Sequence, residues 1–133
     1  MLDNSLTLSV DVAHDSNLVD ITYTRFDELL NRSVYNSENH NDLKRDTLGF
    51  YRTLPKKSGN SRGVKKSAFK LTQDQDVPGV DATTTLVAPA IFDVSSSLPV
   101  GTSPAVVMEM RQRLVALINS DVFIKRLMED LEY

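Results

Sequence analysis

Nine of the 15 basic residues in this 133-residue chain lie within one segment, residues 44–70. Asp46 is the only acid among them, so the segment carries a net charge of +8, although the formal net charge of the whole chain is −3. A local charge of this size attracts polyanions, whereas a solvated basic face is the simpler reading of a charge run taken alone. The segment is the first candidate for a ligand site.

Other residues capable of chemistry are sparse. The chain has no cysteine, which excludes disulfides, thiolate catalysis and cysteine-based zinc sites. His14 and His40 are far apart in the sequence and have no repeated acid spacing beside them, so we expect no histidine metal site. No serine lies in a Gly-x-Ser-x-Gly elbow that is followed by a histidine. We therefore predict no catalytic residue, no metal, no cofactor and no enzyme activity.

Asp74-Gln75-Asp76 begins like a calcium-binding loop. Pro78 occupies the position of the third ligand, however, and Thr85 stands where the bidentate glutamate belongs. An EF-hand is rejected, and only a looser calcium contact at an assembled interface stays open.

Two strands must position the basic residues. Thr47 to Leu54 and Val64 to Thr72 read as strands joined by a basic hairpin loop with a flexible tip. Because side chains alternate between the two faces of a strand, apolar residues such as Phe50 and Phe69 on the core side leave a polar set on the other side. That set comprises Gly49, Tyr51, Thr53, Lys66, Ala68, Lys70 and Thr72.

This polar set matches what single-stranded RNA requires of a protein surface. Lysines meet phosphates, the Tyr51 ring can stack on an unpaired base, and Thr53 can hydrogen-bond a base edge. The loop between the strands offers an alternative RNA contact through Lys56, Lys57 and Arg62.

The remaining strands surround this pair. Leu6 to Val12 and Val19 to Thr24 alternate apolar and polar residues and predict a hairpin closed by residues 14–17. Val34 and Tyr35 fit a short strand, followed by an exposed polar loop over residues 36–42. Thr83 to Ser95 predicts the last β region, in which Pro89 marks an edge, a bulge or a break.

Two helices follow. Ser103 supplies a capping hydroxyl before Pro104, and apolar residues then recur at helical spacing up to Ile118. Asp121 is expected to cap a second helix that runs to Tyr133. Strands first and helices last predict an α+β fold with an antiparallel sheet of about five strands.

Length and composition fit one domain over residues 1–133, because 41% of the residues are hydrophobic and 25% are charged. We divide it into a hairpin over 1–26, a sheet over 33–98 and helices over 103–133. The longest uncharged run, Val94 to Met108, is broken by proline and glycine, which predicts no membrane partner. No secretory signal is visible.

The sequence resembles the coat proteins of single-stranded RNA bacteriophages, the leviviruses. Its C-terminal run from Ser103-Pro104 through Arg111–Ser120 to Leu131-Glu132-Tyr133 is similar to the paired helices of that family. Lys66-Ser67-Ala68-Phe69-Lys70 is similar to the family's RNA-facing strand. Two departures are Ala68, where the family has a residue that can hydrogen-bond a base, and Tyr51, where it has a small hydroxyl.

The resemblance implies an interlocked homodimer with one continuous sheet, which assembles into an icosahedral T=3 shell around genomic RNA. It implies binding of an operator hairpin as translational repressor, a location in the virion capsid, and synthesis in the bacterial host cytoplasm. Loops such as Asp74 to Asp81 would make contacts between dimers. A small cellular RNA-binding regulatory module is the alternative function. The expected dimer interface comprises Val107, Met110, Leu114, Leu117, Phe123 and Leu127.

Overall fold

The computed structural model describes residues 2–132 and divides the chain into two compact units, residues 1–98 and residues 99–133. The first unit is built on one six-stranded sheet in which each strand pairs with its neighbour in the sequence. This confirms the predicted antiparallel sheet of about five strands, and the N-terminal hairpin is part of it. The strands are β1 (Ser5–Val10), β2 (Val19–Leu29), β3 (Arg32–Ser37), β4 (Asp46–Thr53), β5 (Val64–Pro78) and β6 (Thr85–Pro99).

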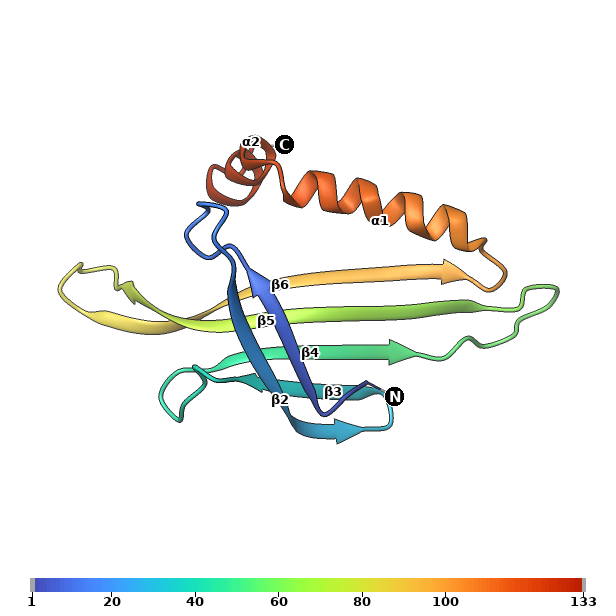
Figure 1. Ribbon diagram of the computed structural model, residues 1–133, viewed down its shortest axis with the longest axis horizontal. Coiled ribbons are helices and arrows are strands. Elements are labelled where there is room, and N and C mark those ends of the chain that lie inside the picture. The colour runs from blue at the N-terminus through green and yellow to red at the C-terminus, as the bar shows by residue number, and fades with distance from the viewer. Residues whose placement is uncertain (1, 133) are drawn as a thin grey trace. The chain divides into compact units, whose positions relative to one another are not determined.

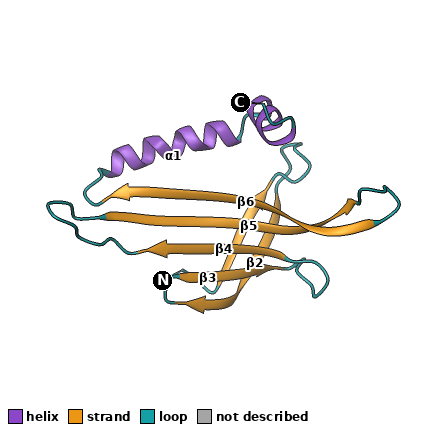
Figure 2. Cartoon of the chain, turned by 180° about the vertical axis from the view of Figure 1, so that it is seen from behind, coloured by secondary structure: helices purple, strands orange, loops and turns teal. Residues whose placement is uncertain are grey.

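The hairpin of β1 and β2 forms as its alternation predicts. Its turn is held by the Asp11 carboxylate, which accepts hydrogen bonds from the backbone N–H groups of Asp15 at 2.9 Å and Ser16 at 3.0 Å. Strand β2 is longer than predicted, because a bulge at Phe26 lets it continue alongside β3. Both views of the molecule show β1 and β2 crossing the direction of β3 to β6 (Figures 1 and 2).

The core of the first unit lies where the hairpin meets the sheet. Tyr23, Tyr35 and Leu48 are buried there, and Phe50 packs against them with its ring 5.6 Å from that of Tyr35, edge to face. The fully buried Tyr35 donates its hydroxyl hydrogen bond to the backbone carbonyl of Asp3 at 2.7 Å. The sequence predicted β3 as a short strand, and this burial explains why so short a strand is stable.

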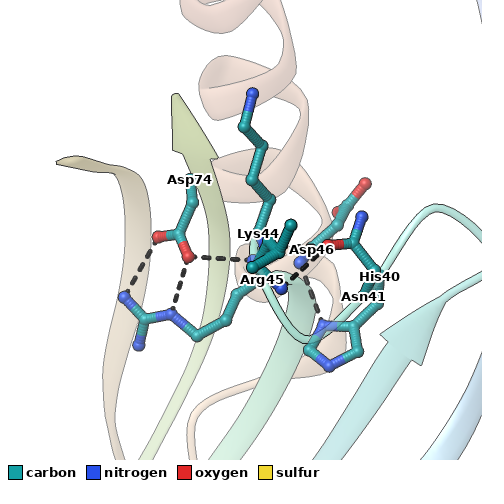
Figure 3. Close-up of polar contacts among 7 residues, drawn as sticks. His40, Asn41, Lys44, Arg45, Asp46 and Asp74 are labelled. Atoms are coloured by element: carbon teal, nitrogen blue, oxygen red, sulfur yellow. Dashed lines mark hydrogen bonds and ion pairs between the residues drawn. The ribbon is translucent and has the colours of Figure 1, made fainter. Parts of the chain in front are cut away.

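Ion pairs fasten the loop between β3 and β4 to β5, and Figure 3 shows the one between Arg45 and Asp74. The Arg45 guanidinium donates to both carboxylate oxygens of Asp74 at 3.1 Å, and the Arg45 backbone N–H donates to the same group at 2.8 Å. Lys44 pairs with Asp76 at 2.5 Å. His40 accepts the backbone N–H of Asp46 through Nδ1 at 3.2 Å. These contacts hold the loop against the far half of β5.

Two sequence predictions are corrected in this region. Asp74 was expected to begin a loop reaching Asp81, but β5 continues to Pro78 and leaves only residues 79–84 as the connection to β6. The predicted exposed loop over residues 36–42 begins later, because β3 includes Ser37. Both strands extend beyond their sequence patterns because pairing with neighbouring strands satisfies their backbone groups. Pro89 lies inside β6, which is the edge strand of the sheet, as one of the three readings of that proline predicts.

The second unit contains α1 (Pro104–Ile118), α2 (Asp121–Ile124) and a π-helical turn η1 (Lys125–Glu129). Ser103 caps α1 as predicted, with its side chain accepting the N–H of Val106 at 3.4 Å. The second helix differs from the prediction, since Ser120 is its N-cap residue and Asp121 its first helical residue. Its helical turns end at Glu129, and Tyr133 lies outside the described residues. No helix within residues 2–132 is long and apolar enough to cross a membrane.

Candidate nucleic-acid interface

The register of β4 and β5 brings the predicted polar residues onto one face of the sheet. Tyr51 pairs with Ala68 and Thr53 pairs with Lys66. Directly opposed residues on antiparallel strands point to the same side, and residues two apart on one strand do so as well. Lys70, opposite Gly49, and Thr72, opposite Thr47, therefore share this side. We call it the basic face, consisting of Tyr51, Thr53, Lys66, Ala68, Lys70 and Thr72.

The Tyr51 ring lies across the sheet above Gly49. A Cβ atom added at Gly49 would come within 2.9 Å of the Tyr51 ring and hydroxyl, so only glycine leaves room for the ring in this position. Lys70 from β5 lies over the ring, with Nζ 5.8 Å from its centroid, which is within the range of a cation–π contact. The aromatic ring that could stack on a base thus has an ammonium group beside it and is still 36% exposed.

Strand β6 adds residues to this face. The Lys70 ammonium lies 3.9 Å from the Asp93 carboxylate, and the Ser67 hydroxyl lies 2.6 Å from that of Ser96. From Ser67 to Lys70 the chain advances three residues along β5, while their partners go back three residues along β6, from Ser96 to Asp93. This is the register of an antiparallel pair. Asp93 therefore shares the face of Lys70, and alternation places Ser95 and Ser97 there too.

A shallow hollow of about 400 Å³ lies at the end of this face. The side chains around it include hydroxyl groups and the cations of Arg52 and Lys66, which can hydrogen-bond to phosphate, ribose or a base edge. Its lining residues are Tyr51, Arg52, Thr53, Lys66, Ser67, Ala68, Ser95, Ser96 and Ser97.

The basic loop between β4 and β5 contains a tight turn. Ser58 and Ser61 exchange backbone hydrogen bonds of 3.1 and 3.0 Å, which close a tight turn. Gly63 has a φ of +94°, and a Cβ there would lie 2.5 Å from the backbone oxygen of Lys56, so this position requires glycine. The predicted flexible tip thus contains a hydrogen-bonded turn. It carries Lys56, Lys57 and Arg62, none of which is among the residues that line the hollow.

The residues predicted to form a dimer interface lie on the two helices of the second unit. Within the described part of α1, α2 and η1, no residue is buried. Leu117, Phe123 and Leu127 line an apolar hollow of about 330 Å³ within this unit. The exposed large side chains of the predicted set are Met110, Leu114, Leu117, Phe123 and Leu127, and Val107 is half-buried.

Metal binding is the other chemistry that the sequence raised. Among residues 2–132, no group of three or more His, Asp or Glu side chains could hold a metal ion. Asp74 and Asp76, which the sequence left open for calcium, make ion pairs with Arg45 and Lys44 instead. The Arg45 guanidinium holds the pKa of the Asp74 carboxyl below its usual value, mainly through their side-chain hydrogen bonds.

No protein-family model matches the sequence, and no curated protein matches it. Solved structures do match over nearly the full chain. A chain from the virus-like particle of bacteriophage AVE019 superposes with a TM-score of 0.73 at 14% identity, covering 96% of this chain and 94% of that chain. A chain from the virus-like particle of Beihai levi-like virus 21 does so with a TM-score of 0.72 at 10% identity, covering 100% and 98%. A chain from the virus-like particle of Wenzhou levi-like virus 4 superposes with a TM-score of 0.72 at 17% identity, covering 95% of this chain and 85% of that chain.

The chain has the levivirus coat protein fold. This confirms the fold that the C-terminal helices and the lysine-containing strand implied. The likeness extends to the first 45 residues, since the match to the chain of Beihai levi-like virus 21 covers 100% of this chain. At these identities the coat protein fold is preserved by the pattern of strands and helices and not by shared side chains.

Sequence reasoning missed several residues of the basic face. Asp93, Ser95 and Ser97 join it through the register between β5 and β6, and no turn signal in the sequence defined that register. The close approach of the Tyr51 ring to Gly49 was missed as well. The only available signal was a glycine inside a predicted strand, which is typical of a close approach by another group.

Proposed function

We propose that the chain is the coat protein of a single-stranded RNA bacteriophage. The observation that supports this proposal is the fold. It matches chains of virus-like particles, and each match covers nearly all of both chains. The role is structural and not enzymatic. The two units, residues 1–98 and 99–133, serve together as one coat protein domain.

The assembling species is a homodimer. Its interface is formed by the apolar residues of α1 and α2 named above, which a monomer would leave exposed over a larger area than soluble monomers usually tolerate. Strand β6 is a 15-residue edge strand, and pairing it with the same strand of a second copy would continue the sheet. Obligate homodimers commonly bury about 2,000–5,000 Å². At about 25 cal/mol per Å² of apolar area, this strongly favours association.

The dimers assemble into an icosahedral T=3 shell that encloses genomic RNA, and the loop of residues 79–84 makes contacts between dimers. The basic face lines the interior and binds phosphates through Lys66 and Lys70, while Tyr51 stacks on an unpaired base. Binding of an operator hairpin to this face represses translation. The protein is made in the cytoplasm of the bacterial host and ends in the virion.

Expression of the chain alone in bacteria tests this function. We expect closed particles in negative-stain electron micrographs, with nuclease-protected RNA in the purified fraction. Elution only at the mass of a dimer, with RNA bound, would favour a small cellular RNA-binding module. Particles that contain no RNA would support the shell and contradict the role of the basic face.

A further inference from the structure

The two lysines of the basic face differ in their surroundings. Lys70 lies 3.9 Å from the Asp93 carboxylate and 5.8 Å from the centre of the Tyr51 ring. Lys66 lines the serine-containing hollow, and no carboxylate of residues 2–132 forms an ion pair with it. One cation of this face is thus engaged by groups of the protein itself, and the other is available to a ligand.

We propose that Asp93 is a specificity-determining residue that competes with RNA for Lys70 and selects the base that stacks on Tyr51. This inference rests on the proposed function, because it concerns RNA binding at the basic face. A phosphate that reaches Lys70 competes with Asp93, whose carboxylate lies 3.9 Å from the Lys70 ammonium. A base that stacks on Tyr51 competes with the same ammonium for the ring, because Nζ lies 5.8 Å from the ring centroid.

The displaced carboxylate determines which base is accepted. Once Lys70 turns to a phosphate, Asp93 is left as an acceptor beside a polyanion, which is unfavourable unless a donor reaches it. The exocyclic amino group of cytosine is such a donor, and a carboxylate accepts from it well. Uracil carries a carbonyl oxygen at the same position, so it brings two acceptors together. Asp93 therefore disfavours uracil beside Tyr51 and favours cytosine.

The test compares two single-stranded 20-nucleotide probes, oligocytidylate and oligouridylate, in fluorescence anisotropy with the dimeric protein. We expect the wild-type chain to bind oligocytidylate about threefold to tenfold more tightly. Asp93→Asn should bind oligouridylate about twofold to fivefold more tightly than wild type does, because Lys70 is released. The preference for cytosine should shrink, since an amide can donate to uracil as well as accept from cytosine.

Asp76→Asn is the matched control. Asp76 and Asp93 have equally exposed side chains, 51% each, and each pairs with a lysine of similar exposure. Asp76 lies six residues along β5 from Lys70, about 20 Å at the usual rise per residue, so its charge is screened from the Lys70 site. We expect it to leave both affinities unchanged. An equal gain in this control would overturn the proposal, because the effect would then be one of net charge.

A second background tests whether Asp93 acts through Lys70. In a Lys70→Ala chain, Asp93→Asn should bring a smaller gain in oligouridylate affinity than it does in wild type. An undiminished gain, or equal affinities of wild type for the two probes, would overturn this inference while leaving the proposed function intact. Absence of RNA binding by both wild type and Asp93→Asn would overturn the RNA-binding role and this inference with it.

Discussion

The two faces of strands β4 and β5 differ in what they carry and in how well the chain covers them. On one face Leu48 opposes Leu71 and Phe50 opposes Phe69. The residues that alternate with them along the two strands point to the opposite side and form the basic face, which includes Tyr51. Strict alternation along two paired strands gives both surfaces from the same residues, so one register error would exchange them.

The apolar face is covered unevenly. Leu48 is only 4% exposed, because it belongs to the core with Tyr35 under the N-terminal hairpin, whereas its partner Leu71 is 37% exposed. Phe69 on the same side is 42% exposed. The difference indicates that the hairpin supplies a core for one half of this face only. Under the proposed function, a second copy of the chain covers apolar surface and RNA covers the basic face. Substitutions should therefore disrupt dimerisation and RNA binding separately.

The largest effect is expected from breaking the apolar contacts. Leu114→Asp would place an unpaired charge in the proposed dimer interface, which costs several kcal/mol of association free energy. We expect no dimer in analytical ultracentrifugation and no particles. Gln112→Asp, which adds the same charge to the same helix, is the control and should assemble. A fully assembled Leu114→Asp protein would show that this side of α1 is not an interface.

Removal of the Lys66 and Lys70 charges should weaken RNA binding at the basic face and leave dimerisation unchanged. In Lys66→Ala/Lys70→Ala dimers, each lost phosphate contact lowers the log–log salt slope of single-stranded RNA binding by about 0.7. The measurement is RNA affinity across a salt series, with dimer mass as the check on assembly. Lys56→Ala/Lys57→Ala in the basic loop is the matched control. If the loop variant lost slope and the strand variant did not, RNA would contact the loop.

Removal of the Tyr51 ring should cause a smaller loss of RNA affinity, of a different physical origin. Tyr51→Ala should weaken RNA binding by about 1–3 kcal/mol through lost stacking, with nearly the same salt slope as wild type. Tyr51→Phe keeps the ring and should retain most of the affinity. The same salt series measures both variants, and a loss of slope in Tyr51→Ala would mean that the ring positions a cation instead of stacking on a base.

The sequence predicted the part of the fold that local rules determine. Alternation placed Tyr51, Thr53, Lys66 and Lys70 on one side, and their register confirms this placement. The capping hydroxyl of Ser103 was identified from its position before proline. Such features depend on periodicity and on backbone geometry within a few residues, which a single sequence contains.

Features that depend on distant pairing could not be predicted in the same way. Asp93 reaches Lys70 only through the pairing of β5 with β6. Asp74 is part of β5 because backbone pairing continues there, with its N–H donating to the Arg45 carbonyl at 2.9 Å. The complete burial of Tyr35 depends on the hairpin packing over it. In each case the deciding partner lies more than ten residues away, where no turn or cap signal defines the contact.

The smallest expected effect lies outside both faces, in the contact of Arg45 with Asp74. The Asp74 side chain is only 9% exposed, and its pKa lies below the usual value because the Arg45 side chain and backbone donate to it. A carboxyl with a lowered pKa in the folded state stabilises that state above its unfolded pKa of about 4. This stabilisation is lost as the pH falls through the lowered value, so at neutral pH it is fully present.

Hydrogen exchange can measure this contact. Asp74→Asn should lower the protection factors of amides in residues 38–46 at pH 7, and wild type should lose the same protection only on acidification below about pH 4. Asp76→Asn removes a more exposed ion pair and should change protection less. Dimer mass and RNA affinity should stay at wild-type values, because the contact belongs to neither face. Unchanged protection in Asp74→Asn would mean that backbone pairing alone holds the loop against β5.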